Sequence, residues 1–187
     1  MRILLLAPPG AGKGTQGTAL AAHFGVAHIS SGDLLRSEIA AGTPLGRQVQ
    51  EYLDAGDLVP DEVMEELLRP IVVQAAHAGG YVLDGFPRTL HQSEQAAEIA
   101  ANLHVQLEAV LFLTVPDHLL VERLVGRARG ADDTPATIHH RLELFHAETE
   151  PLVERYRERG LLRQIDGTGA PDDVTAACVA ALADLDG

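Results

Sequence analysis

The residues best suited to bind phosphate lie in one short stretch near the N-terminus, residues 10–15, with Lys13 inside it. Lys13 is the only lysine among the 14 lysine and arginine residues of the chain. Its ammonium group is compact and sits on a flexible stem, so it can reach between phosphate oxygens where the planar fork of an arginine would not fit. We expect Lys13 to contact a transferred phosphate and the backbone N–H groups of the stretch to surround the neighbouring phosphates.

The segments on either side of this stretch support a phosphate-binding loop of the nucleotide-triphosphate kind. Residues 3–6 predict a strand and residues 15–24 a helix, and a glycine-rich turn between them directs N–H groups at an anion. The loop departs from the general motif at Ala7, where a glycine is usual, and at Gly14, which follows the lysine. The alternative is a glycine- and proline-rich turn with an incidental lysine, which does not account for the strand and helix around it.

A second group of candidates follows the predicted strand at residues 81–83. Asp84 at the end of that strand is well placed to hold Mg²⁺, mainly through the waters of the metal. Arg88 could bind a phosphate with its two parallel N–H groups. An Asx turn beside a solvated arginine is the alternative, and the phosphate loop elsewhere in the chain makes it less favourable.

Four arginines form a third group: Arg123, Arg127, Arg129 and Arg141. Arg123 and Arg127 are four residues apart and share one helix face. Phosphoryl transfer requires such fixed cations, because charge on the moving group and on the flanking phosphates must be balanced. Cations that complement a helix C-terminus would explain Arg127, but not Arg129 or Arg141.

The elements that must position these residues form an α/β pattern. Short apolar segments alternate with segments of helical periodicity, which predicts a parallel sheet with helices on both faces. Ligands of such sheets bind at the carboxyl ends of the strands, where the candidates fall. Two stretches, about 33–74 and 128–134, interrupt the alternation and are candidate mobile flaps. The predicted strands are 2–6, 26–29, 81–83, 109–115 and 161–165, and the predicted helices are 15–24, 89–101, 118–127, 136–159 and 172–185.

Composition restricts the class of protein. A net charge of −13 argues against nucleic-acid and anionic-membrane partners, which require a positive surface. The single cysteine, Cys178, permits no internal disulfide and reads as a core residue. Metal binding by His139, His140 and His146 is disfavoured, because adjacent side chains point apart on a helix. With no signal peptide or membrane-spanning run, we expect one soluble, cytoplasmic domain that is a monomer.

The motifs taken together closely resemble the adenylate kinases, over essentially the whole chain and in order. The resemblance rests on Gly-Ala-Gly-Lys-Gly-Thr-Gln at 10–16, Ser-Gly-Asp-Leu-Leu-Arg at 31–36, Gly-Asp-Leu-Val-Pro at 56–60, and Asp-Gly-Phe-Pro-Arg at 84–88 with Gln92. It continues through Gly-Arg at 126–127, Asp-Asp at 132–133, Arg-Leu at 141–142, and Thr-Glu-Pro-Leu at 149–152. Gly14, unusual in the general motif, is the form found in this family.

The resemblance implies the reaction ATP + AMP ⇌ 2 ADP with Mg²⁺, and a site for each nucleotide. The residues it assigns to ATP are Gly10, Ala11, Gly12, Lys13, Gly14, Thr15, Arg123, Arg127 and Gly169. Those it assigns to AMP are Ser31, Arg36, Asp57, Leu58, Val59, Gly85, Phe86, Pro87, Arg88, Gln92, Arg129 and Arg141. The residues expected to act on the transferred group are Lys13, Arg88, Arg127, Arg129 and Arg141. A carboxamide such as that of Gln92 offers one donor and one acceptor, which match an adenine edge.

The resemblance also implies a division of the single domain, residues 1–187. The core would comprise 1–29, 60–127 and 135–187, with a helical AMP-binding insertion at 30–59 and a short lid at 128–134. Both flaps would close to exclude water. A lid of this length leaves no room for a cysteine-rich zinc site, so no structural zinc is expected.

Two alternatives stay open from the sequence. A related kinase could act on UMP or CMP, although Ser31 and Gln92 favour AMP. A non-catalytic nucleotide sensor could keep the fold, but it would be expected to lose Lys13, Arg88 or the lid arginines, and all are present. The departures from the family pattern are Ala7, Ser31 in place of threonine, and Gly130, which lengthens the lid and affects the assignment of Arg129.

Overall fold

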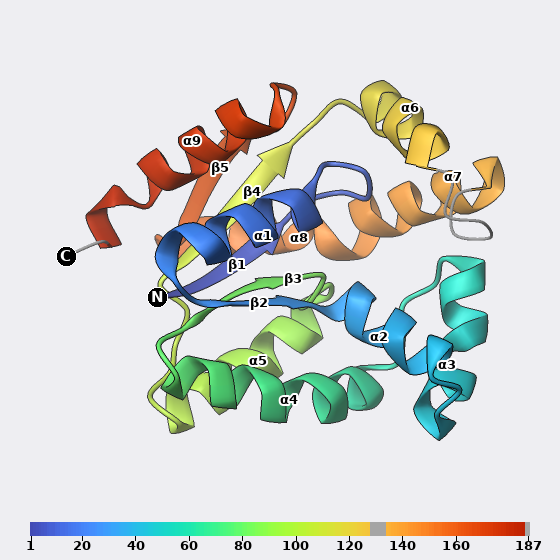
Figure 1. Ribbon diagram of the computed structural model, residues 1–187, viewed down its shortest axis with the longest axis horizontal. Coiled ribbons are helices and arrows are strands. Elements are labelled where there is room, and N and C mark those ends of the chain that lie inside the picture. The colour runs from blue at the N-terminus through green and yellow to red at the C-terminus, as the bar shows by residue number, and fades with distance from the viewer. Residues whose placement is uncertain (128–133, 186–187) are drawn as a thin grey trace.

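The computed structural model describes residues 1–127 and 134–185, apart from the side chain of Arg127, and contains one parallel sheet. Its five strands lie in the order β2-β3-β1-β4-β5 (Figure 1). The predicted α/β class with a parallel five-stranded sheet is confirmed. The strands are β1 (Arg2–Leu6), β2 (Ala27–Ser30), β3 (Tyr81–Asp84), β4 (Ala109–Thr114) and β5 (Leu162–Asp166).

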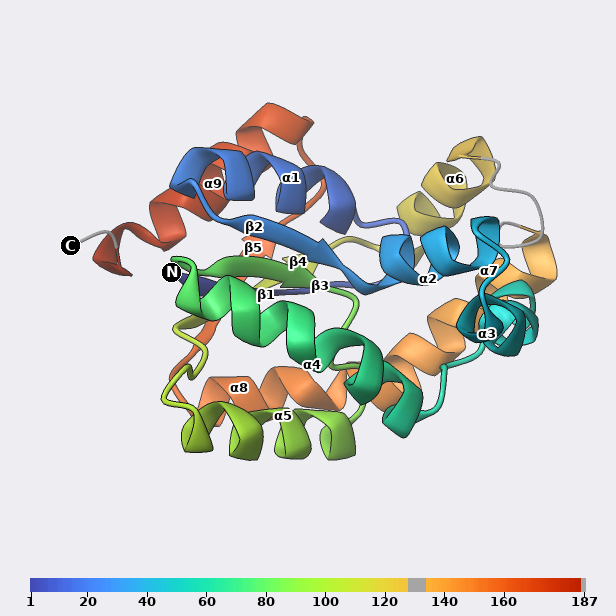
Figure 2. The same cartoon turned by 60° about the horizontal axis from the view of Figure 1, so that its bottom comes forward.

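Helices cover both faces of the sheet, which explains why its strands are almost continuously apolar. Side chains of β1 alternate between the two layers: Ile3 and Leu5 pack into one apolar cluster, and Leu4 and Leu6 into the other. Figure 2 shows α1 (Lys13–Phe24) and α9 (Pro171–Ala181) on one side, and α4 (Asp61–His77), α5 (Leu90–Asn102) and α8 (Pro151–Glu158) on the other.

Two helical pairs lie beyond the carboxyl ends of the strands. One pair is α2 (Ser31–Ala40) with α3 (Pro44–Ala55), and the other is α6 (Asp117–Arg127) with α7 (Pro135–Leu144) (Figure 1). α2 and α3 approach closely because Gly46 has no side chain: a Cβ there would lie 2.1 Å from the carbonyl oxygen of Glu38. The two pairs therefore frame the edge of the sheet at which the candidate residues gather.

The single helix predicted over residues 136–159 is wrong. The chain forms α7, then a π-helical turn at Phe145–Thr149, then α8, which begins at Pro151. Proline lacks an N–H group and its ring crowds the preceding turn, which disfavours a regular α-helix through Pro151. The wide turn closes through a 2.8 Å hydrogen bond from the N–H of Glu150 to the carbonyl of Phe145. Such turns are frequent at functional sites.

The structure confirms that Cys178 is a core residue. Cys178 is fully buried in the cluster beneath α1 and α9, and burial raises the pKa of its thiol to about 11. In residues 1–127 and 134–185, no helix is long and apolar enough to cross a membrane.

Candidate active site

The loop between β1 and α1 is shaped by two glycines with left-handed backbone angles. Gly10 has φ +84° and Gly12 has φ +96°, a region that other residues rarely adopt. Gly10 also lies against α6, where a Cβ would come within 2.9 Å of Leu124 Cγ. Ala7 needs no such freedom, because its methyl group is buried in the core cluster, so this departure from the family pattern fits the structure.

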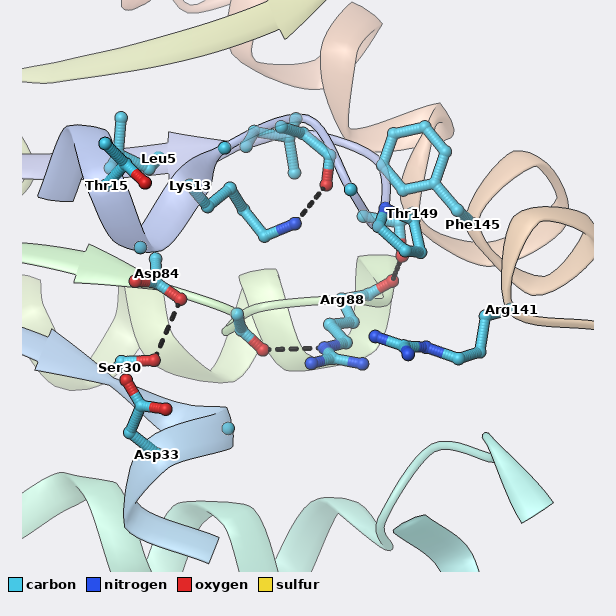
Figure 3. Close-up of a pocket in the computed structure, with 18 of the residues that line it drawn as sticks. Leu5, Lys13, Thr15, Ser30, Asp33, Asp84, Arg88, Arg141, Phe145 and Thr149 are labelled. Carbon is cyan, nitrogen blue, oxygen red and sulfur yellow. Dashed lines mark hydrogen bonds between the residues drawn. The ribbon is translucent and has the colours of Figure 1, made fainter. Parts of the chain in front are cut away.

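Lys13 begins α1 and turns back over this loop. Its ammonium donates a 2.8 Å hydrogen bond to the carbonyl oxygen of Ala7 (Figure 3). It donates a second, of 3.0 Å, to the carbonyl oxygen of Pro8. Gly14 follows with no atom within 4 Å of the position its Cβ would take. The loop thus presents a cation and open space at the N-terminus of α1, which is the geometry that binds phosphate groups.

Asp84 ends β3, which lies between β2 and the central strand β1. In the parallel register it stands beside Leu5 of β1 and Ser30 of β2. It is 5% exposed, and its Oδ1 accepts a 3.2 Å hydrogen bond from the Ser30 hydroxyl (Figure 3). Its Oδ2 lies 2.7 Å from Nε2 of His28, which must carry the hydrogen because a carboxylate only accepts. His28 was not among the predicted residues. A polar ring inside an apolar strand was the available signal, since a buried polar group requires a partner.

Arg88 stands opposite Lys13 across the cleft. Its Nε donates to the carbonyl of Gly85 (2.8 Å), and its own carbonyl accepts a 2.8 Å hydrogen bond from the hydroxyl of Thr149, in the π-helical turn. Figure 3 shows the guanidinium groups of Arg88 and Arg141 pointing toward each other. Burial, with a further contribution from the charge of Arg141, lowers the pKa of Arg88 to about 10. Arg88 thus remains charged at neutral pH, and two cations held this close favour an anion between them.

These residues line a cleft of about 540 Å³, and a smaller cavity of about 60 Å³ opens beside it. Arg36, Leu58, Gly85, Arg88 and Arg141 border both spaces. The smaller cavity therefore adjoins the cleft that contains the phosphate loop.

The smaller cavity contains polar groups among apolar side chains. Ser31 is fully buried, and its hydroxyl has no hydrogen-bond partner in the described part of the chain. Gly85, with φ +80°, faces that hydroxyl so closely that a Cβ would lie 2.3 Å from it. Gln92 also lines the cavity and is 3% exposed. An unpaired hydroxyl and a carboxamide at the wall of a cavity of mixed polarity are features of a ligand site.

The structure brings together most of the predicted residues. Those that line the large cleft are Gly10, Gly12, Lys13, Gly14, Thr15, Arg36, Leu58, Asp84, Gly85, Pro87, Arg88, Arg123 and Arg141. Those that line the smaller cavity are Ser31, Arg36, Asp57, Leu58, Val59, Gly85, Arg88, Gln92 and Arg141.

The remaining predicted residues lie apart from these walls or outside the described residues. Ala11 is buried in the core, and Phe86 packs against the apolar cluster on the other face of β1. Gly169 is exposed, one residue after the Gly167–Thr168 carbonyls to which Arg123 donates at 3.1 and 3.3 Å. The side chain of Arg127 and all of residues 128–133, including Arg129 and Gly130, lie outside the described residues.

The two helical pairs touch across the cleft. Asp57, just after α3, lies with Oδ1 2.6 Å from Nε2 of His140 on α7. A Cβ on Gly56 would come within 2.8 Å of Arg141. The contacts of Gly56 and Asp57 place the end of α3 beside Arg141 of the cleft.

His146, which was considered as a metal ligand, is instead engaged with the carboxylates of Asp117 and Glu150.

Comparison with known proteins points to one family. The adenylate kinase family model matches residues 5–161. An adenylate kinase of Nocardia farcinica is 45% identical over 97% of this chain and 99% of its own length. An adenylate kinase of Stenotrophomonas maltophilia strain R551-3 is 44% identical over 97% of this chain and 99% of its own length. One of Micrococcus luteus is 47% identical over 93% of this chain and 86% of its own length.

Proposed function

This chain belongs to the adenylate kinase family and is an ATP:AMP phosphotransferase, and we propose that its cleft holds ATP at the phosphate loop and AMP in the smaller cavity. The observation that carries this assignment is the placement of Lys13 and of Arg88 with Arg141 in one continuous cleft. A phosphoryl group between them would be surrounded by cations from both nucleotide sites.

The chemistry requires no side-chain base, because the attacking AMP phosphate is already an anion. One phosphoanhydride bond breaks and another forms, so the protein must align the reactants, balance charge and exclude water. Lys13 and the N–H groups of residues 10–15 would hold the ATP phosphates, and Arg88 the AMP phosphate. Arg123, Arg127 and Gly169 would complete the ATP site, and Arg129 and Arg141 would bind phosphates on closure.

The AMP site would be completed by the smaller cavity. Its unpaired Ser31 hydroxyl and the Gln92 carboxamide supply the polar contacts, with the backbone of Asp57, Leu58 and Val59 beside them. We propose that 30–59 moves as the AMP-binding insertion and 128–134 as the lid, on a core of 1–29, 60–127 and 135–187. The contact between Asp57 and His140 is consistent with closure over the cleft.

Asp84 fits the requirements of a Mg²⁺ site that acts through water. It is a carboxylate in the cleft whose two oxygens are oriented by Ser30 and His28. No group of three or more potential metal-ligating side chains occurs among the described residues, so the nucleotide phosphates would supply the other contacts. The ion would neutralise charge on the transferred group. We also propose that the protein has no structural zinc and that it is a cytoplasmic monomer.

Replacing Asp84 with asparagine tests this role. Asp84→Asn keeps the size of the side chain but removes its charge, so we expect kcat to fall about 100-fold and the Mg²⁺ concentration for half-maximal activity to rise. Titration of activity with Mg²⁺ at fixed ATP measures both. Asp172→Asn, at an exposed position on α9, is the matched control. An unchanged Mg²⁺ dependence in Asp84→Asn would remove the ion from this carboxylate.

The proposed acceptor is tested with a panel of nucleotides. Purified protein with Mg-ATP is offered AMP, CMP, UMP or no acceptor, and the products are separated by chromatography. We expect ADP to form strongly only with AMP, and ADP alone to yield ATP and AMP. A preference for a pyrimidine nucleotide would contradict the assignment of Gln92, and binding without turnover on any acceptor would contradict catalysis by this cleft.

A further inference from the structure

Gln92, at the wall of the proposed AMP cavity, has both polar atoms of its carboxamide engaged by the protein. Oε1 accepts a 2.7 Å hydrogen bond from the backbone N–H of Arg88, and Nε2 donates a 2.7 Å hydrogen bond to Oδ1 of Asp61. Asp61 is the first residue of α4, 31 residues away in the chain. Arg88 is itself assigned to the acceptor phosphate, whereas Asp61 lines neither the cleft nor the smaller cavity.

We propose that Asp61 is a positioning residue that fixes the orientation of the Gln92 amide and thereby selects acceptors with a 6-amino purine over those with a 6-oxo purine. The inference rests on the proposed function, in which Gln92 contacts the acceptor base. The inference adds Asp61, which contacts Gln92 and not the acceptor base.

The two hydrogen bonds permit only one orientation. A flipped amide would place the oxygen of Gln92 against the carboxylate of Asp61, so that two acceptors faced each other. It would also place the amide NH₂ against the N–H of Arg88, so that two donors did the same. Gln92 is 3% exposed and Asp61 is half-buried, and an unmatched polar pair is costly where water has little access.

Asp61 is itself held in place. Its second oxygen, Oδ2, lies 2.6 Å from Nδ1 of His91, the residue before Gln92. This hydrogen bond is the main cause that raises the pKa of His91, which favours the protonated ring as donor. Both carboxylate oxygens are thus engaged, and because a carboxylate only accepts hydrogen bonds, Asp61 has no donor for the oxygen of a flipped Gln92.

The fixed amide has one hydrogen and one lone pair left for a ligand. The edge of adenine offers an acceptor at N1 and a donor at its 6-amino group, which match that arrangement. Hypoxanthine, the base of IMP, has the same shape but the opposite polarity, with a donor at N1 and an acceptor at O6. Because the protein holds the amide, IMP leaves buried polar groups unmatched, which is the strongest basis for rejection.

The test compares kcat/KM for AMP and IMP in the wild-type enzyme and in Asp61→Asn. Asparagine can present either an oxygen or an NH₂ group, so it removes the constraint from the side of Asp61 and leaves only the N–H of Arg88 to oppose a flip of Gln92. We expect the wild-type enzyme to prefer AMP by about 10⁴-fold. In Asp61→Asn that ratio should fall about tenfold or more, because AMP is used less well while IMP is used equally well or better.

A purely structural role for Asp61 would lower kcat/KM for both acceptors by the same factor, and an unchanged AMP/IMP ratio would overturn the proposal. The ratio comes from a single preparation, so it is independent of partial unfolding. Asp172→Asn, which removes a carboxylate from the first turn of α9, is the matched control. Gln92→Ala distinguishes failure of the proposed AMP site from failure of the role of Asp61. If Gln92→Ala leaves kcat/KM for AMP unchanged, the assigned AMP site is wrong. If Gln92→Ala causes a large loss but the AMP/IMP ratio of Asp61→Asn is unchanged, only the role of Asp61 is refuted.

Discussion

Lys13→Met is expected to lower kcat by about 10³-fold or more, since a fixed cation on the transferred phosphate contributes on that scale in phosphoryl transfer. Methionine has nearly the length of lysine but no charge. It also loses the hydrogen bonds to the carbonyls of Ala7 and Pro8, which hold the ammonium over the loop. Steady-state ADP formation at saturating ATP and AMP measures the effect.

Two further variants make this result specific to Lys13. Lys13→Arg keeps a positive charge but replaces the compact ammonium with a planar fork, so we expect it to recover only a small part of the activity. Arg69→Met removes an exposed cation from α4 and should leave kcat unchanged. Circular dichroism would show that all three variants are folded. Near-normal turnover by Lys13→Met would contradict the role of the ammonium.

Arg88→Ala is expected to lower kcat/KM for AMP by about 10³-fold, with a much smaller effect on the KM for ATP. Arg88 is held by hydrogen bonds to Gly85 and from Thr149, and its guanidinium faces that of Arg141. Removing it leaves the acceptor phosphate with one cation fewer. The measurement is the pair of KM values, determined by varying each nucleotide at saturation of the other.

Thr149→Val provides a graded comparison. It removes only the hydroxyl that donates to the carbonyl of Arg88, so we expect a loss of about tenfold in kcat/KM for AMP, which corresponds to one hydrogen bond. An Arg88→Ala enzyme with an impaired KM for ATP and a normal KM for AMP would place the residue in the other site.

The strands, and the position of the phosphate loop between a strand and a helix, could be predicted because they depend on local pattern. Each apolar run lies between turn residues. Gly10 and Gly12 occur where the backbone has left-handed angles. The order of candidates along the chain also indicated the site, because the carboxyl ends of parallel strands meet at one edge.

The residues that orient the site could not be predicted in the same way. His28 and Asp84 are 56 residues apart, Asp61 and Gln92 are 31 apart, and Thr149 and Arg88 are 61 apart. Each pair forms only when folding of the sheet brings distant strand ends and helices together. Such long-range contacts leave no periodic pattern in the sequence. The π-helical turn that contains Thr149 was not predicted, because the helical periodicity of residues 136–159 continues through it. Pro151, where α8 begins, was the available signal for an interruption.

The two-site arrangement of the cleft is tested most directly by a crystal structure of the complex with a bisubstrate compound in which a chain of phosphates joins two adenosines. We expect one adenine to lie against Gln92 and the other near Gly169. The phosphates should run past Arg88 and Arg141 to Lys13. A complex with neither adenine in the cavity lined by Ser31 and Gln92, or with the phosphates outside the cleft between Lys13 and Arg88, would contradict the account.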